Sequence, residues 1–239
     1  MGTLYIVATP IGNLEDITIR AIKTLFSVDI IACEDTRRTG LLLQELTKRY
    51  QTVVPGLTRN PAALVRLDEH TEQQGVPQII GALTQGQVVA LVSDAGTPLI
   101  SDPGFLLVRE AMKRGITVVS IPGPTAAIAA LTSSGLPTDK FFFLGYPPEK
   151  SSHRIKLFES LLNLHRCKLS STFILYCAPH KLMQTLEDMK NVFGDIDIVV
   201  ARELTKVHEE VWRGTISAAL DCFANPKGEL VLLFNILQA

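Results

Sequence analysis

Short runs of apolar residues that do not alternate with polar ones recur along the first half of the chain. They cover residues 4–9, 29–33, 88–92 and 116–121. Such runs are typical of strands in parallel sheets, where helices bury both faces. Between them, apolar residues at helical spacing predict helices, as at Ile19, Ile22 and Leu25. Strand–helix alternation over about 130 residues therefore predicts a doubly wound parallel sheet.

Capping and breaking residues predict where the helices begin and end. Asp16 is suited to be the N-cap of the first helix. Ser101-Asp102-Pro103 predicts another helix start, because a capping side chain precedes a proline at the first helical position. A helix over residues 105–114 is expected to end at Gly115. Residues 50–68 show little periodicity and are expected to form a long loop.

The second half of the chain predicts a different sheet. Its strands are expected over residues 141–144, 171–176, 196–201, 209–215 and 229–236. The last two are expected to pair, partly antiparallel, around a helix at residues 217–224. We therefore predict two α/β domains, a mainly parallel one over residues 1–121 and a mixed one over residues 122–239.

Composition narrows the class of protein. Hydrophobic residues make up 46% and charged residues 20% of the 239 positions, as in ordinary soluble domains. The net charge of −1 argues against wholesale electrostatic binding of nucleic acid but permits a local basic face. No signal peptide, membrane-length apolar segment or Cys-x-x-Cys spacing is present. We therefore expect a cytoplasmic protein with buried free thiols, no metal and no membrane association.

Polar residues gather where the predicted first-half strands end. Ser93-Asp94-Ala95-Gly96-Thr97-Pro98 follows one apolar run, and Asp35 and Arg37 follow another. Ligands of open α/β sheets bind in the crevice beyond the strand ends, which predicts a binding site here. A strand–turn–helix connection with caps and no ligand is the alternative. The turn after the first strand holds only Gly12, which is not a dinucleotide fingerprint.

Two charged segments stand out in the second half. Lys150, His153, Arg154 and Lys156 form the densest basic cluster, which suits either a solvated helix face or phosphate binding. The segment from Arg202 to Lys206 leaves a buried strand, and in extended geometry Arg202, Leu204 and Lys206 share one face. Lys206 is then either directed at a cleft or a surface lysine paired with Glu209 or Glu210.

Five motifs occur together and in order, at residues 5–18, 32–37, 91–98, 121–125 and 201–206. They resemble the motifs of the ribosomal RNA small-subunit methyltransferase I family, part of the tetrapyrrole-methylase-like superfamily. The resemblance covers essentially all 239 residues. It implies two α/β domains with the active site in the cleft between them, S-adenosyl-L-methionine as cofactor, and usually a homodimer. The implied reaction is methylation of the ribose 2′-hydroxyl of a cytidine in 16S rRNA of the small ribosomal subunit.

The resemblance and the strand-end chemistry together predict the site residues. Candidates for cofactor binding are Pro10, Asp94, Ala95, Gly96, Thr97, Thr125, Ala126, Tyr176 and Ala201. Candidates for handling the hydroxyl proton are Asp35, Glu203 and Lys206. Candidates for binding RNA phosphate are Arg37, Lys150, Arg154 and Arg202. The donor is already activated as a sulfonium, so catalysis rests mostly on positioning and needs no metal.

The chain departs from the family pattern at several places. Where relatives usually have Tyr-Glu-x-Pro-His-Arg, it has Tyr176-Cys177-Ala178-Pro179-His180-Lys181, and Thr71 stands where asparagine is commoner. The sequence ends at Ala239, without the small C-terminal extension of many relatives, which bears on RNA affinity more than on cofactor binding. Two alternatives stay open. One is a methyltransferase of the same fold acting on a tetrapyrrole or other small substrate; the other is a non-enzymatic binding module.

Overall fold

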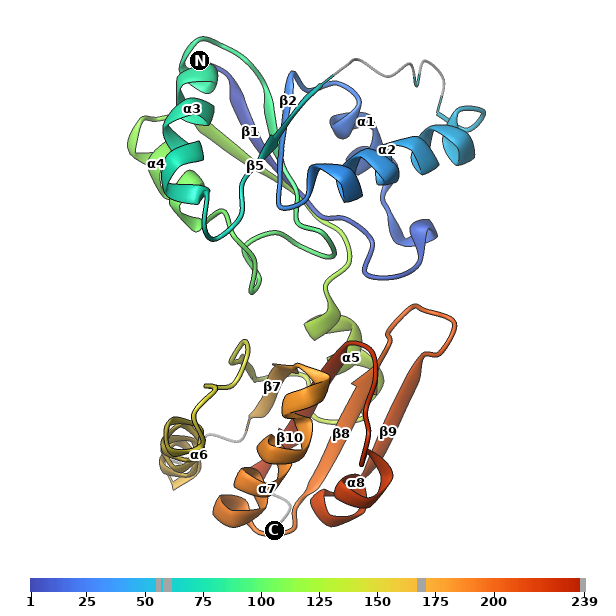
Figure 1. The fold of residues 1–239 in the computed structure, drawn as a ribbon, viewed down its shortest axis with the longest axis vertical. Coiled ribbons are helices and arrows are strands. Elements are labelled where there is room, and N and C mark those ends of the chain that lie inside the picture. Colours follow the sequence, from blue (N-terminus) through green and yellow to red (C-terminus); the bar gives the residue numbers. More distant parts are fainter. Residues whose placement is uncertain (55–56, 58–61, 167–170, 237–239) are drawn as a thin grey trace. The chain divides into compact units, whose positions relative to one another are not determined.

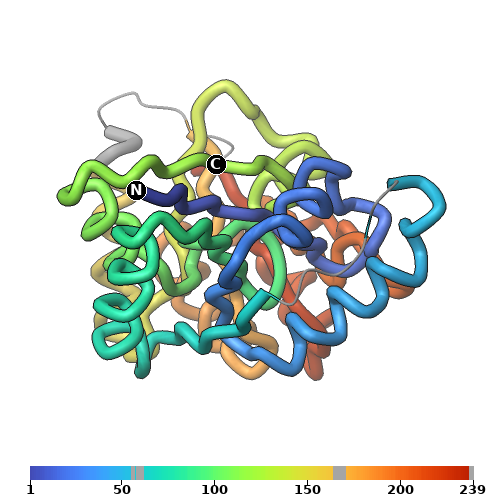
Figure 2. The backbone as a smooth tube through the Cα atoms, turned by 90° about the horizontal axis from the view of Figure 1, so that it is seen from above, coloured from blue at the N-terminus to red at the C-terminus, as the bar shows by residue number. Residues whose placement is uncertain are grey.

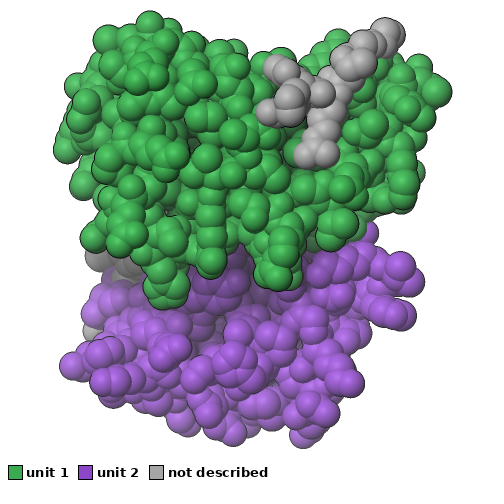
Figure 3. All heavy atoms as spheres, turned by 45° about the horizontal axis from the view of Figure 1, so that its top comes forward, with its two compact units in different colours: residues 1–125 green, residues 126–239 purple. Residues whose placement is uncertain are grey.

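The computed structural model describes residues 1–54, 57, 62–166 and 171–236. It divides the chain into two compact units, unit 1 over residues 1–125 and unit 2 over residues 126–239 (Figure 3). Each unit holds one five-stranded sheet. The division into folding domains after residue 121 stays a prediction.

Unit 1 is built on a wholly parallel sheet, as the apolar runs predict. The strand order is β3-β2-β4-β1-β5. The strands are β1 (Thr3–Val7), β2 (Ile30–Cys33), β3 (Ala63–Arg66), β4 (Val89–Leu91) and β5 (Thr117–Ile121). Because all five run in the same direction, their carboxyl ends meet at one edge of the sheet.

Helices cover both faces of this sheet. They are α1 (Ile19–Leu25), α2 (Thr36–Tyr50), α3 (Glu72–Thr84) and α4 (Phe105–Lys113). Helices α1 and α2 lie on one side and α3 and α4 on the other, as two views show (Figures 1 and 2). Along β2, Ile31 and Cys33 pack into the core with α1 and α2, and Ala32 packs into the core with α3 and α4. Burial on both faces explains why the strands lack polar alternation.

Three local predictions in unit 1 are wrong. Strand β3 lies within the segment expected to be loop. Thr18 caps α1, its Oγ1 accepting from Ala21 N at 3.0 Å, while Asp16 belongs to a 3-10 turn. Helix α4 starts after Gly104, not at Ser101, because Gly104 has a non-helical φ of +121°, and a Cβ there would clash with Leu91.

Unit 2 contains the mixed sheet, in the order β6-β7-β10-β8-β9. Its strands are β6 (Phe141–Phe143), β7 (Thr172–Cys177), β8 (Asp197–Arg202), β9 (Glu210–Thr215) and β10 (Leu230–Asn235). Among the described strand pairs of this sheet, β6 and β7 run parallel and the other three pairs are antiparallel. The predicted pairing of the last two strands is wrong, because β8 lies between β9 and β10.

The faces of the second sheet are covered unequally. Three helices pack with the strands into one core, namely α6 (Ser151–Arg166), α7 (Leu182–Phe193) and α8 (Ile216–Cys222). Helix α5 (Ala126–Ser134) instead contacts β7, β8, β9 and β10. Its small residues Ala127 and Ala130 are buried, which permits close approach to the sheet.

The burial of the cysteines and the length of the helices test two expectations from composition. Cys33 and Cys177 are buried free thiols and Cys222 is an exposed one, whereas Cys167 lies outside the described residues. The prediction of buried thiols is thus confirmed at two positions and wrong at Cys222. Within the described residues, no helix is long and apolar enough to cross a membrane.

Candidate functional site

The loops at the carboxyl edge of the unit 1 sheet are joined by backbone hydrogen bonds. Thr9, just after β1, donates its N–H to Gly96 O at 2.8 Å, and Gly96 N–H donates to Thr9 O at 3.0 Å. Thr9 Oγ1 also donates to Ser93 O at 3.2 Å. These bonds fix the segment after β4 against the turn that holds Pro10.

The segment after β5 joins the same edge. Thr97 Oγ1 donates to Pro124 O at 3.0 Å. Gly96 has φ +86°, and a Cβ there would lie 3.3 Å from Ile11 Cγ2, so the turn requires glycine. The predicted cofactor residues Pro10, Ala95, Gly96 and Thr97 are thereby brought together, with Thr125 following Pro124.

Two groups of Asp94, its backbone N–H and one carboxylate oxygen, have partners in the structure, and its other carboxylate oxygen has none among the described residues. Its backbone N–H donates to Glu34 Oε1 at 3.1 Å, and its Oδ2 pairs with Arg38 Nη1 at 3.1 Å. Its Oδ1 is buried and has no hydrogen-bond partner among the described residues. A buried acceptor without a donor is costly, so this atom suits a hydroxyl or amine of a ligand.

Carboxyl groups crowd around Asp94. Burial raises the pKa of Glu34, helped by the charges of Asp94 and Glu69 and opposed by its hydrogen bond from Asp94 N–H. Burial also raises the pKa of Asp102 to about 7, helped by the charges of Glu34 and Asp94 and opposed by a hydrogen bond with Ser93. Glu34, Arg38 and Asp102 thus surround the candidate ligand atom of Asp94. The sequence places Glu34 and Arg38 in the charged segment after β2, but their contacts with Asp94 arise only from the tertiary fold.

Asp35 and Arg37 lie at the start of α2 and pair with each other. Asp35 is the N-cap, its Oδ1 accepting from Arg37 N at 2.8 Å, and its Oδ2 lies 3.3 Å from Arg37 Nη2. The side-chain and backbone hydrogen bonds from Arg37 lower the pKa of Asp35. Asp35 is therefore ionised at neutral pH, which suits it to accept a hydrogen bond from a ligand hydroxyl.

The predicted cofactor residues of unit 2 have different environments. The hydroxyl of Tyr176, at the end of β7, accepts from Ala127 N at 3.3 Å, next to Ala126 at the start of α5. Ala201 is fully buried in β8, between Val211 and Val231. This burial argues against direct cofactor contact by Ala201.

The predicted geometry of Lys206 is wrong. Glu203 and Thr205 have φ values of +51° and +64°, so the chain turns after β8 rather than continuing extended. Lys206 Nζ pairs at 3.0 Å with both Glu203 and Glu229, not with Glu209 or Glu210. Burial opposes its charge, yet these two carboxylates outweigh burial and raise the pKa of Lys206. Lys206 therefore does not have the lowered pKa that a general base requires.

Two of the residues predicted to bind phosphate, Arg154 and Arg202, form ion pairs with carboxylates within unit 2. Arg154 is only 2% exposed, and its Nε donates to Asp188 Oδ2 at 2.8 Å. This placement argues against phosphate binding by Arg154. Arg202 pairs with Glu210 at 2.8 Å. Lys150 is exposed and makes no ion pair within the described part of the chain.

Residues 3–220 match the family of tetrapyrrole (corrin/porphyrin) methylases. The chain is 47% identical over 236 residues to the "Ribosomal RNA small subunit methyltransferase I" of Synechocystis sp., covering 98% of this chain and 78% of that protein. It is 41% identical over 237 residues to the protein of the same name from Thermotoga maritima, covering 98% and 99%. The chain belongs to the ribosomal RNA small subunit methyltransferase I family.

The family fold also occurs in more distant proteins. The uroporphyrin-III C-methyl transferase of Thermus thermophilus, solved with S-adenyl homocysteine, superposes with a TM-score of 0.62 at 14% identity, covering 99% of both chains. At this identity the likeness shows the fold alone. The predicted α/β architecture with one parallel and one mixed sheet is confirmed.

In this member of the ribosomal RNA small subunit methyltransferase I family, Cys177, the departure from the family pattern named in the sequence analysis, ends strand β7. The thiol is buried in the core of unit 2. Burial raises the pKa of Cys177 to about 11, against the hydrogen bond with Thr185 and the nearby charge of Arg154. The thiol is neutral at pH 7 and is not a nucleophile.

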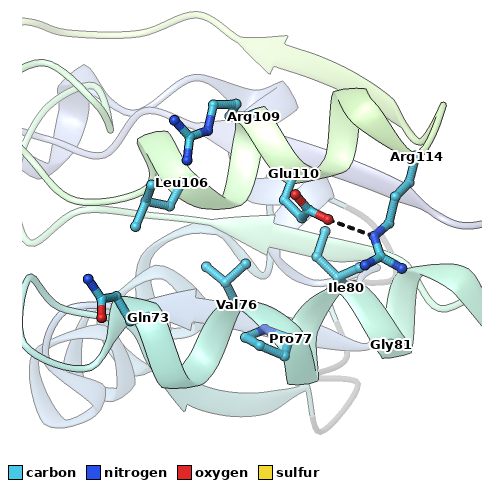
Figure 4. A pocket seen from close by; sticks show the side chains of 9 residues that line it. All are labelled: Gln73, Val76, Pro77, Ile80, Gly81, Leu106, Arg109, Glu110 and Arg114. Carbon is cyan, nitrogen blue, oxygen red and sulfur yellow. Dashed lines mark hydrogen bonds and ion pairs between the residues drawn. The ribbon is translucent and has the colours of Figure 1, made fainter.

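A groove of about 360 Å³ lies between α3 and α4 (Figure 4). None of the residues predicted above to bind cofactor or RNA lines it. Its lining consists of Gln73, Val76, Pro77, Ile80, Gly81, Leu106, Arg109, Glu110 and Arg114. Arg114 Nε pairs with Glu110 Oε1 at 2.9 Å across one end. Every lining residue belongs to a helix or its C-cap, so the groove is distinct from the site at the strand ends.

Proposed function

We propose that this protein transfers a methyl group from S-adenosyl-L-methionine to the ribose 2′-hydroxyl of a cytidine in 16S rRNA of the small ribosomal subunit. The observation that carries the proposal is the nearly full-length match, at 41% and 47% identity, to small subunit rRNA methyltransferases. The nucleoside and the hydroxyl follow from the family resemblance.

The carboxyl edge of unit 1 fits the proposed cofactor. S-adenosyl-L-methionine brings an activated methyl group and offers a ribose diol, an amine, a carboxylate and an adenine edge. The buried Oδ1 of Asp94 accepts from a hydroxyl or the amine, which removes the cost of leaving it unpaired. The backbone of Ala95, Gly96 and Thr97, held by Thr9 and Pro124, supplies fixed polar groups for the remainder.

The ribose hydroxyl must lose its proton as it attacks, and Asp35 is the candidate that remains best placed to orient it. Lys206 is charged and paired with two carboxylates. Glu203 accepts from both Lys206 Nζ and Glu229 N, which fits a role in holding the turn after β8. Within the described residues, the hydrogen bonds and ion pair of the Asp35 carboxylate are with Arg37 at the start of its own helix, and the carboxylate is ionised.

For RNA phosphate, the remaining candidates are Lys150 and Arg37. Lys150 is exposed and makes no ion pair within the described residues, and Arg37 exposes most of its side chain while paired to Asp35. We place the reaction in the cytoplasm, on assembled subunits, and propose a homodimer as the working form. Light scattering on the purified protein tests the dimer, and a monomer mass at micromolar concentration would contradict it.

Mass mapping of ribose methylation tests the function. Small subunits from cells lacking the protein, incubated with purified protein and S-adenosyl-L-methionine, should gain one methyl group on one cytidine ribose of 16S rRNA. Methyl transfer to precorrin-type molecules but not to subunits would favour a small substrate. No heat of S-adenosyl-L-methionine binding by titration calorimetry would instead indicate a non-enzymatic binding module.

A further inference from the structure

Two groups of Asp94 are held by the segment that leads into helix α2. Strands β2 and β4 are neighbours in the parallel sheet, with Ala32 opposite Leu91, so the residues that follow them lie side by side at the carboxyl edge. There, Glu34 Oε1 accepts from the backbone N–H of Asp94 at 3.1 Å. Arg38, in the first turn of α2, donates from Nη1 to Asp94 Oδ2 at 3.1 Å. The backbone and the side chain of Asp94 are therefore both held by this one segment.

These contacts leave one carboxylate oxygen of Asp94 for a ligand. Arg38 pairs with Oδ2, and Oδ1 is buried without a hydrogen-bond partner among the described residues. Rotation about the last torsion of the side chain would exchange the two oxygens. Because such a terminal torsion has only a broad preference of its own, an external contact is needed to fix it. The ion pair with Arg38 is that contact.

Stability does not explain this ion pair. The side chains of Arg38 and Asp94 are 70% and 26% exposed, and solvent-exposed pairs contribute little to the free energy of unfolding. Arg38 also lies at the positive end of the dipole of α2, where a cation is unfavourable. The position of this cation is therefore explained by its contact with Asp94 and not by the stability of the helix.

Arg38 also supplies a positive charge next to a group of carboxyls. Burial raises the pKa of Glu34 and of Asp102, and the charge of Asp94 adds to the rise at both. The charge of Arg38 opposes the rise at Glu34. Without Arg38, the carboxylate of Asp94 would face like charges alone, which favours its rotation away from them.

We propose that Arg38 is a positioning residue for the cofactor: by pairing with Oδ2 of Asp94, it holds Oδ1 ready to accept a hydrogen bond from S-adenosyl-L-methionine. Arg38 acts through the carboxylate and does not itself contact the cofactor. The inference rests on the proposed function, since it takes S-adenosyl-L-methionine as the ligand and Asp94 as its contact. The alternative role for an exposed arginine is a contact with RNA phosphate, and the test separates the two.

Titration calorimetry with S-adenosyl-L-methionine measures the Kd of each variant. Arg38→Ala should raise the Kd about tenfold, a coupling of the size found between contacting residues. Arg38→Lys should recover part of the affinity, because an ammonium can still pair with Oδ2 but lacks the fixed fork of the guanidinium. Arg49→Ala removes an exposed, ion-paired arginine from the last turn of the same helix. It is the matched control and should bind like wild type.

A double-variant comparison tests whether Arg38 acts through Asp94. In the Asp94→Ala background, Arg38→Ala should change the Kd less than about twofold, because no carboxylate is left to position. The urea midpoint of Arg38→Ala should stay close to that of wild type, because the pair is exposed. Should Arg38→Ala fail to fold, Arg38→Gln provides the same comparison with an expected severalfold rise in Kd, since its amide keeps a donor but no charge.

A wild-type Kd in Arg38→Ala would overturn the inference, and so would equal losses of affinity in the wild-type and Asp94→Ala backgrounds. So would normal cofactor binding with weakened binding of a labelled single-stranded oligoribonucleotide in fluorescence anisotropy, because Arg38 would then be a phosphate contact. Calorimetry needs no methyl transfer. Cofactor binding without methylation of subunits would therefore contradict the proposed function alone, and no cofactor binding by wild type would contradict both.

Discussion

At the scale of single residues, Asp94 combines a fixed backbone with an unused acceptor. Asp94→Asn should weaken S-adenosyl-L-methionine binding by about 1.5–3 kcal/mol, because a charge-assisted hydrogen bond to the buried oxygen is lost. Titration calorimetry on the folded variant measures this. Asp221→Asn, an exposed residue of α8, is the control and should bind like wild type. Equal affinities of both variants would remove Asp94 from the cofactor site.

Asp102 should make stability depend on pH. Its pKa is about 7 in the folded chain against 3.8 ordinarily, so the folded state holds an extra proton between these values. The contribution of Asp102 to the free energy of unfolding is therefore fully present below about pH 4, and it is lost as the pH rises to about 7. The negative charges of Glu34 and Asp94 add to the raised pKa of Asp102, and the hydrogen bond with Ser93 opposes it.

Urea unfolding at pH 5 and pH 8 checks this expectation. Wild type should lose more stability between the two pH values than Asp102→Asn, by on the order of 1–2 kcal/mol after allowance for partial exposure. Asp221→Asn should behave like wild type. Parallel pH profiles for all three proteins would show that Asp102 titrates normally.

How far the site could be predicted also depends on single residues. The segment of residues 93–98 is visible in the sequence because polar residues follow an apolar run. The partners of Asp94 are not visible, since Arg38 and Glu34 lie 56 and 60 residues away along the chain. Arg154 was misplaced for the same reason: its neighbours in sequence are basic, but its partner Asp188 is 34 residues distant.

At the scale of elements, one buried ion pair joins α6 to α7. Asp188→Ala should destabilise the protein by about 3–5 kcal/mol, because it leaves the Arg154 charge buried and unpaired. Arg154→Met/Asp188→Leu should recover part of this loss, limited by the hydrogen bonds to Pro148 O and Glu149 O.

Urea denaturation of these variants provides the measurement, with Asp197→Ala as the control, since Asp197 is exposed on β8. A loss below about 1 kcal/mol in Asp188→Ala would mean that water or another group compensates the Arg154 charge.

Elements themselves were predictable where local pattern decides them. Buried parallel strands stand out because both faces are apolar. Strand β3 is not visible in the pattern because it is a short edge strand in which two of the four residues are exposed and none is fully buried. The order of β8, β9 and β10 was misjudged because strand pairing depends on long-range contacts that local periodicity does not encode.

At the scale of the whole molecule, the net charge of −1 limits the electrostatic affinity of the protein for RNA. Because its 24 acidic residues balance its 23 lysines and arginines, it should bind naked RNA weakly and assembled small subunits better. Lys150→Ala should lower the salt slope of single-stranded RNA binding by roughly 0.7, the value for one phosphate contact. Cofactor affinity should not change.

Lys113→Ala is the matched control, because Lys113 is an exposed lysine of α4 that already pairs with Glu110. Its salt slope should equal that of wild type, since a paired lysine contributes little to counterion release. Kd values measured by anisotropy across a series of potassium chloride concentrations give the slopes. If Lys150→Ala and Lys113→Ala share the wild-type slope, Lys150 contacts solvent and not phosphate.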